Sequence, residues 1–483
     1  MSKKDKQELR QQIACEWLHE NYLQFGNLRH DVVADRLQVR CAHSLGEEAI
    51  GRLGERQELW RNLTDKDINT MVCQCVAESG VNISVTEMWT ALKSDMVPAV
   101  HPLRAWLDGL RPYTADQPDW IDFVAQQVHV KNNNAECGIN KDNLNNLCAR
   151  PTLALAKEDI SPLSQQQSVS SPLSNVGEAE ELSMLSSEQT NPLSLQDSLA
   201  DTLWRACFKK WFVAMVASWM HDEVVNHTVL VLVGRQGIYK TTWLDHLIPP
   251  ALRPYSSKLP LSGQISKDDR LRLCENGMLN IDELDAICGR EMNIMKSLLT
   301  STDINERAAY GRLKERKVRL ASFCASTNKR EFLTDITGNR RWLPFEVESI
   351  QNPFYTTLPY EMMYAQAVYL VQNDFNYWFD MDEIEVMEQH NEEFRAQENE
   401  EQLLPILFDI PAEGKGEFMT TAEISERLVT YGNIKKPMKT RQLGMLMAKK
   451  GFQKKQVFLS GTNVRGWMVY NRQIDEIKLA KNI

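Results

Sequence analysis

The stretch that decides the fold is GRQGIYKTT at residues 234–242. It follows the uncharged apolar run TVLVLV at 228–233 and precedes WLDHLI, which is typical of the start of a helix. A strand, a glycine-containing loop, Lys-Thr and a helix are the layout of a phosphate-binding loop, because the loop N–H groups and the lysine point at one anion. The usual pattern is GxxxxGK[ST], and here Tyr239 replaces its last glycine.

A nucleotide on this loop requires one carboxylate that holds magnesium and a second that polarises the attacking water. The segment MLNIDELD supplies both, since Asp282 and Glu283 directly follow four largely apolar residues. We therefore predict that Asp282 holds Mg²⁺ together with Thr241 and that Glu283 acts on the water. An acidic pair after a strand is by itself more often a helix cap, so the Walker B interpretation depends on the loop that contains Lys240.

Two further polar segments occur in the order that such a site needs. The strand-like RLASFCASTN ends in Asn328, which fits a sensor that positions water, although a turn-forming Asn is the alternative. The block TDITGNRRWLPF places Arg340 and Arg341 after a Gly-Asn turn. Either arginine is predicted as a finger for the γ-phosphate of a neighbouring subunit, and a surface turn with a salt bridge is the alternative.

Composition limits the class of protein. A chain of 483 residues with 43% hydrophobic content has room for two to four domains, and a net charge of -10 excludes a uniformly basic nucleic-acid binder. The ten cysteines form no CxxC pair and no zinc spacing, which indicates a reducing compartment. The N-terminus lacks a signal peptide, and the apolar run at 211–220 is shorter than the about 20 residues that span a bilayer. We expect a cytoplasmic protein with no membrane partner.

The chain divides by pattern into a series of regions. Apolar residues at helical spacing predict a helical N-terminal domain over 1–130. Residues 131–198 are rich in Ser, Gln, Asn and Pro and hold no aromatic residue, which predicts a disordered insert. Over 199–350, strands alternate with helices, which predicts an α/β core with a parallel sheet covered on both faces. Residues 351–411 are acidic and predict a solvated helical connector.

The last region, 412–483, predicts two helices followed by a hairpin. Ten bases and no acid lie between residues 432 and 472. This arrangement favours a small α+β winged-helix-like domain on nucleic acid, with Lys454 and Lys455 among its contacts, and a basic protein-binding face is the alternative. A second basic stretch at 308–317 (AAYGRLKERK) predicts a hairpin or loop that faces a nucleic-acid backbone through Arg312, Lys314 and Lys317.

Taken together, GRQGIYKTTWL, LNIDELD, the YGR of 310–312, CASTN and FLTDITGNRRWLPFEV resemble the virulence-associated protein E family (VapE, or VirE-like) of P-loop proteins. That family is similar to superfamily 3 helicases and often adjoins primase-helicases. The resemblance covers 199–347 and is most specific in GNRRW. It implies an ASCE-type, AAA+-like ATPase of a mobile-element replication or virulence-associated module, which uses ATP and Mg²⁺ and moves on single-stranded DNA. It also implies a homo-oligomeric ring, a hexamer, and a primase or replication partner.

Carried over by position, the resemblance implies that Lys240 contacts the β- and γ-phosphates. Thr241 and Asp282 then hold Mg²⁺, and Glu283 is the base. Asn328 is the sensor, and Arg340 or Arg341 the finger. The nucleotide-binding positions are Gly234, Gly237, Tyr239, Lys240, Thr241 and Thr242.

Tyr239 is the residue that supports a different function. A bulky side chain at a position that often has φ > 0 costs about 1 kcal/mol or more. Tyr239 is therefore a tolerated variant, a side chain that stacks on the nucleotide, or the mark of a slow enzyme. The last case corresponds to a nucleotide-binding regulator or scaffold with a degenerate loop and little hydrolysis.

Overall fold

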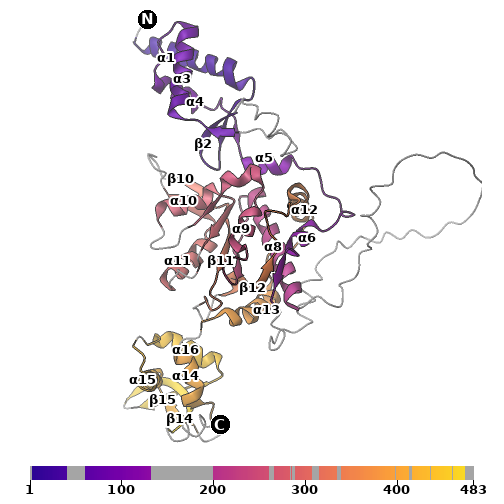
Figure 1. The fold of residues 1–483 in the computed structure, drawn as a ribbon. Helices are drawn as coiled ribbons and strands as arrows, with labels where there is room; N and C mark the ends of the chain where they lie inside the picture. Colours follow the sequence, from indigo (N-terminus) through magenta and orange to yellow (C-terminus); the bar gives the residue numbers. More distant parts are fainter. Residues whose placement is uncertain are drawn as a thin grey trace, which may run out of the picture.

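The structure is a computed structural model in which an N-terminal, a central and a C-terminal domain follow one another (Figure 1). No helix in the described ranges has the length and apolar character needed to cross a membrane. Residues 132–198, which make up nearly all of the insert predicted at 131–198, lie outside the part of the chain that the structure describes. The structure describes residues 3–40, 60–131, 199–259, 266–282, 284, 289–306, 315–333, 339–396, 399–412, 416–435, 437–459 and 461–473.

The N-terminal domain combines helices with a sheet, so the prediction of a helical domain was wrong. Polar and charged residues fill most strand positions, as in RLQVR of β2, and the strands therefore lack the apolar runs that would reveal them. The sheet has the order β3-β2-β1-β4. Its elements are α1 (Lys3–Leu18), a π-helix (His19–Leu23), β1 (Leu28–Asp31), β2 (Arg36–Arg40), β3 (Trp60–Asn62), α3 (Asp65–Ser79), α4 (Val85–Leu92) and β4 (Ala99–Val100).

The central domain contains a six-stranded sheet in the order β5-β12-β6-β11-β8-β7. All neighbours are parallel except β5 and β12, so the predicted parallel sheet carries one antiparallel edge strand. The strands are β5 (Val128–Val130), β6 (Val229–Val233), β7 (Ser256–Lys258), β8 (Met278–Ile281), β11 (Ser322–Thr327) and β12 (Trp342–Ile350). A separate hairpin pairs β9 (Asp303–Glu306) with β10 (Glu315–Val318).

Helices cover both faces of this sheet (Figure 1). β6 is buried along its whole length, and its alternate residues enter different cores. Leu230 and Leu232 pack with α8 (Leu199–Met220), whereas Val229, Val231 and Val233 pack on the opposite face. The remaining helices of these layers are α9 (Lys240–His246), α10 (Lys267–Glu275), α11 (Gly289–Thr300) and α12 (Tyr360–Gln372), with a 3-10 helix at Pro250–Tyr255. The layered α/β architecture agrees with the sequence prediction.

The tryptophans of α8 fix that helix against the sheet. Trp204, Trp211 and Trp219 are buried, and each indole N–H donates to a backbone carbonyl. The acceptor for Trp211 is Phe323 on β11, at 3.0 Å. These tryptophans are therefore core residues that hold α8 on the sheet.

The central domain begins before residue 131. α5 (Pro102–Asp108), α6 (Trp120–Ala125) and β5 contribute Leu103, Ile121 and Val128 to the core around α8. Residues 1–130 therefore do not form one packing unit. His101 caps α5, because its Nδ1 accepts the Arg104 N–H at 3.3 Å.

The acidic segment is not the solvated connector that its composition predicts, because several of its acids are buried in ion pairs or hydrogen bonds. Glu383 pairs with buried Lys210 at 2.7 Å, and Glu401 pairs with Arg395 at 2.5 Å. Glu400 accepts the Met438 N–H at 2.6 Å. Its helices are α13 (Met381–Asn391), a 3-10 turn (Glu392–Phe394) and α14 (Asn399–Leu407).

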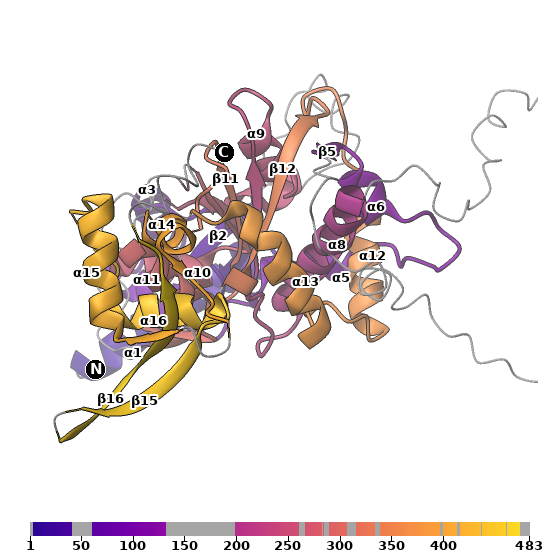
Figure 2. The ribbon, with the colours of Figure 1, turned by 90° about the horizontal axis from the view of Figure 1, so that it is seen from below.

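The C-terminal domain has the predicted helices and hairpin. The hairpin of β15 (Gln453–Leu459) and β16 (Thr462–Asn471) projects away from the helices (Figure 2). Leu404 and Leu407 of α14 lie in the same core as Leu443 and Trp467, so the core of this domain starts within the acidic segment. The other elements are β13 (Phe408–Asp409), β14 (Glu417–Met419), α15 (Thr421–Gly432) and α16 (Thr440–Lys449).

Candidate functional site

Three segments that leave adjacent parallel strands meet at one edge of the central sheet. Gly234 follows β6, Asn328 follows β11 and Asp282 follows β8. We call this the carboxyl edge. In open α/β sheets, ligands bind outside the carboxyl ends of the strands. Three of the predicted site segments therefore lie on the edge where the fold supports a site.

Lys240 is buried at this edge and links the loop to β11. Its ammonium donates to the carbonyls of Gly234 and Arg235 at 2.7 and 2.8 Å and to Asn328 Oδ1 at 3.1 Å. Its side chain thus curls back over the loop that precedes it. Lys240 and Asn328, which the sequence assigns separately to the phosphates and to a sensor role, are thus in direct contact.

Thr241 and Asp282 also meet, as predicted. Thr241 Oγ1 donates to Asp282 Oδ1 at 3.2 Å and lies 2.8 Å from Ser326 Oγ. Lys258 on β7 binds the other carboxylate oxygen at 3.1 Å. Burial favours the neutral acid, but the hydrogen bond and charge of Lys258, with hydrogen bonds from Thr241 and Ser326, hold the pKa of Asp282 below its usual value.

The backbone conformation of the loop accounts for glycine at two positions, and Tyr239 is the exception. A Cβ on Gly234 would lie 2.8 Å from the Val347 carbonyl oxygen, so only glycine fits there. Gly237 has φ 86°, a left-handed conformation. Tyr239 has φ 67° and ψ 16°, also left-handed, although a glycine would adopt this conformation without strain. Thr242 is partly buried on the first turn of α9.

Arg340 and Arg341 lie at the opposite end of the strands. They directly precede β12, and the register pairs Trp342 with Val229 at the start of β6. We call this the amino edge. β6 has five residues, so about 16 Å of strand separates the arginines from the loop of the same chain. The structure does not bring them to Lys240.

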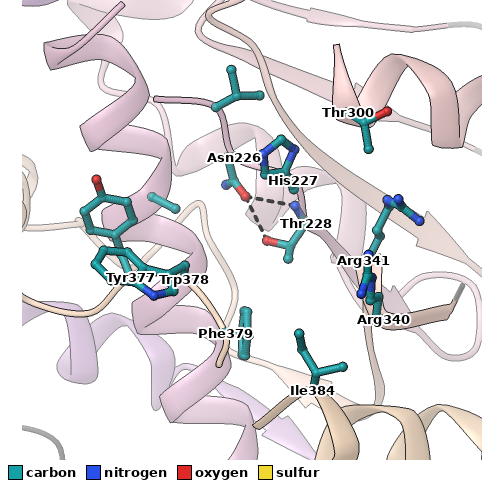
Figure 3. Close-up of a pocket in the computed structure, with 12 residues that line it drawn as sticks. Asn226, His227, Thr228, Thr300, Arg340, Arg341, Tyr377, Trp378, Phe379 and Ile384 are labelled. Atoms are coloured by element: carbon teal, nitrogen blue, oxygen red, sulfur yellow. Dashed lines mark hydrogen bonds between the residues drawn. The ribbon is translucent and has the colours of Figure 1, made fainter. Parts of the chain in front are cut away.

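The two arginines border a pocket of about 390 Å³ at the amino edge (Figure 3). Tyr377 and Trp378 face them across it, and Phe379 forms part of the wall. In the described ranges, neither Arg340 nor Arg341 makes an ion pair. Burial lowers the pKa of Arg341, and the neighbouring charge of Arg340 lowers it further. The pocket therefore suits an anion.

Several predicted site residues are not brought to the carboxyl edge or lie outside the described ranges. Glu283, Arg312 and Lys314 fall outside those ranges. Lys317 on β10 binds Asp35 of the N-terminal domain at 3.0 Å, so it links two domains. On the hairpin, Lys454 lies 5.2 Å from the centroid of the Trp467 ring, and Lys455 is exposed.

Sequence reasoning missed Lys258 and Ser326. Lys258 ends the three-residue strand SSK, which has no apolar run to reveal it. Ser326 lies within the quoted CASTN block, two positions before Asn328, and therefore on the same side of the strand. Alternation along β11 was the signal for Ser326, whereas nothing in the sequence identifies Lys258.

Residues 192–396 match the virulence-associated protein E-like domain. This VapE-like region includes the loop, the carboxylate, Asn328 and both arginines, so the sequence resemblance is confirmed for this part of the chain. No curated protein matches the chain.

Solved structures give only a distant likeness. Two apo structures of the NrS-1 C-terminal region, one its A form and one of residues 305–718, each match with a TM-score of 0.40. They are 10% and 11% identical, and each match covers 94% of this chain and 99% of the other.

Proposed function

We propose that the chain is an ATP-dependent DNA translocase or helicase-like ATPase that acts on single-stranded DNA as a homo-oligomeric ring. The observation that carries this proposal is the set of contacts that joins Lys240 to Asn328 and Thr241 to Asp282. These contacts unite the loop with the ends of two neighbouring strands. A phosphate-binding lysine, a metal ligand pair and a polar sensor are the parts that phosphoryl transfer requires.

The donor set at this edge fits Mg²⁺ as well as a phosphate chain. Mg²⁺ is usually bound by one or two protein oxygens plus substrate phosphates and water. Thr241 and Asp282 offer a hydroxyl and an ionised carboxylate that already touch. When bound, Mg²⁺ would neutralise charge that develops on the phosphates.

Each protein group then has a defined task. Lys240 leaves the Gly234 and Arg235 carbonyls for the phosphates, which are stronger acceptors because they are charged. Asn328 is positioned by its contact with Lys240 and can orient water. Lys258 holds Asp282 ionised in the absence of metal. Glu283, which directly follows Asp282 in the sequence, is the proposed base.

The arginines require a second subunit in this proposal. Because a whole strand separates them from the loop of their own chain, an arginine finger can act only on a neighbour. A head-to-tail contact between the amino edge of one copy and the carboxyl edge of the next is heterologous, and such contacts form a ring when the rotation between copies closes. The pocket beside Arg340 and Arg341 leaves room for an anion from outside.

The C-terminal domain is the proposed DNA-binding part. Two helices followed by a projecting hairpin are the elements of a winged helix. Lys454 and Lys455 lie on that hairpin, where positive charge can meet a phosphate backbone. A primase or another replication protein is the partner class that the family resemblance supplies.

The test is ATP hydrolysis by the full chain with and without single-stranded DNA, alongside a sizing measurement. We expect DNA-stimulated hydrolysis that is lost in Lys240→Ala and in Glu283→Gln. Wild-type turnover in both variants would refute the proposal. Thr202→Ala on α8, outside the loop and the strand ends, serves as a control that retains activity.

Tyr239 supports a second candidate, a nucleotide-binding scaffold with little hydrolysis. Its left-handed backbone is strained where glycine is usual. If the wild-type protein binds ATP but does not hydrolyse it, and Tyr239→Gly restores turnover, the scaffold is the better description.

A further inference from the structure

An exposed group of aromatic rings borders the candidate phosphate loop. Tyr239 and Phe354 retain 38% and 68% of their accessible surface. Their ring centroids are 6.4 Å apart, with an interplanar angle of 81°. His246 on α9 meets the Phe354 ring from another direction, at 5.7 Å and 85°. Edge-to-face contacts of this kind orient the rings without covering them.

The segment that carries Phe354 is held in place from within. It leaves β12 at the carboxyl edge, because β12 runs parallel to β6. Asn352 accepts the Phe354 N–H at 3.0 Å through Oδ1 and donates from Nδ2 to Tyr239 Oη at 3.4 Å. The same side chain therefore fixes the backbone of one ring and the hydroxyl of the other.

A structural role does not explain these rings. Neither ring is part of a hydrophobic core, and glycine would form the loop at Tyr239 without strain. Strained residues and exposed aromatic groups that adjoin one another are typical of binding surfaces. Tyr239 also directly precedes Lys240, so a ligand with its phosphates on the loop has its remaining part close to the rings.

We propose that Tyr239 and Phe354 form a platform on which the base of a bound nucleotide stacks. This proposal rests on the proposed function, because the phosphates must lie on the loop. Asn352 holds the Phe354 N–H with Oδ1 and the Tyr239 hydroxyl with Nδ2, so the surfaces that the platform offers to a base are the two rings. The site then favours purine over pyrimidine nucleotides, since purines have the larger π-face, and accepts ATP and GTP alike.

The experiment compares nucleotides with a ligand that has phosphates and no base. Hydrolysis of ATP, GTP and CTP is measured for the wild type, Phe354→Ala and Tyr239→Gly, and inorganic tripolyphosphate is the competitor. We expect KM for ATP and GTP to rise about tenfold in each variant, which is the size of the stacking of one base on one ring. The inhibition constant of tripolyphosphate should stay unchanged, and Tyr239→Gly should not lower Tm.

Phe25→Ala is the matched control, because Phe25 is 61% exposed and lies in the N-terminal domain. Unchanged KM for ATP in both variants overturns the platform while the proposed function stands. Equal weakening of ATP and tripolyphosphate also overturns it, since the rings would then act only through the shape of the loop. A wild type that binds neither ligand overturns the proposed function together with the platform.

Discussion

The two edges of the central sheet differ in whether their charged side chains have partners in the same chain. At the carboxyl edge, Lys240 and Asp282 both have partners from the same chain. At the amino edge, Arg340 and Arg341 lie side by side in an aromatic-walled pocket with no ion pair to the described residues. The charges at the carboxyl edge are balanced within the chain, whereas two adjacent cations at the amino edge favour an anion from outside. The contrast favours an active site shared between copies.

The largest expected effect is the loss of turnover in variants that damage only one of the two edges. Lys240→Ala and the double variant Arg340→Ala/Arg341→Ala should each lose about 10³-fold or more in turnover, the usual size for an arginine finger. Mixing the two inactive proteins should restore part of the activity, because a mixed ring contains interfaces with one intact edge from each protein. Turnover of mixtures at varied ratios measures this.

Absence of restoration from oligomers of confirmed mixed composition would show that the arginines do not act across subunits. Mixing Lys240→Ala with Asp282→Asn is the control. Both changes lie on the carboxyl edge. Every subunit of that mixture therefore has a damaged carboxyl edge, and no interface is complete.

Asp282→Asn should lower turnover by about a hundredfold at a fixed Mg²⁺ concentration, since it removes the charged metal ligand. The change keeps the shape of the side chain and its contact with Thr241. Excess Mg²⁺ or Mn²⁺ should recover part of the loss. A loss that no metal concentration relieves would place Asp282 outside the metal site.

Lys258→Met should change the Mg²⁺ concentration for half-maximal turnover by several-fold and should shift the pH dependence of Mg²⁺ binding. At pH 7.5 Asp282 stays ionised in either protein, and removal of the competing ammonium should lower the Mg²⁺ concentration for half-maximal turnover. Because Lys258 lowers the pKa of Asp282, its loss raises that pKa, and metal binding should fail at a higher pH on the acid side. Titration of Mg²⁺ affinity between pH 4 and 8 measures both shifts. Unchanged profiles would leave Lys258 without a role at the metal site.

The smallest effect is expected on the hairpin of the C-terminal domain. Lys454→Glu with Lys455→Glu should weaken binding of single-stranded DNA and flatten its salt dependence, by about 0.7 in logarithmic slope for each phosphate that the protein no longer neutralises. Basal hydrolysis without DNA should remain. If neither affinity nor slope changes, DNA is not the partner of this surface.

The sequence predicts the carboxyl edge well because its signals are local. Asp282 and Asn328 each follow an apolar strand directly, and Lys240 lies within a recognisable loop. The contact of Lys258 with Asp282 could not be predicted. β7 is short, and Lys258 lies near Asp282 only because β7 pairs with β8 in the folded sheet. Burial of Glu383 and Glu401 was missed for the same reason, because Lys210 and Arg395 pair with them only in the fold.

The acidic helix α14 has a mechanical consequence. The apolar side of α14 belongs to the C-terminal core. Glu401 on the same helix forms an ion pair with Arg395. The next residue, Ala396, donates its N–H to the Leu333 carbonyl at 2.7 Å. The chain runs directly from Leu333 back to Asn328. A force on the C-terminal domain is therefore transmitted toward Asn328 by this ion pair and a short stretch of backbone, with the Lys449–Glu392 pair beside it. If the chain hydrolyses ATP as proposed, movement of that domain and the position of Asn328 are mechanically coupled.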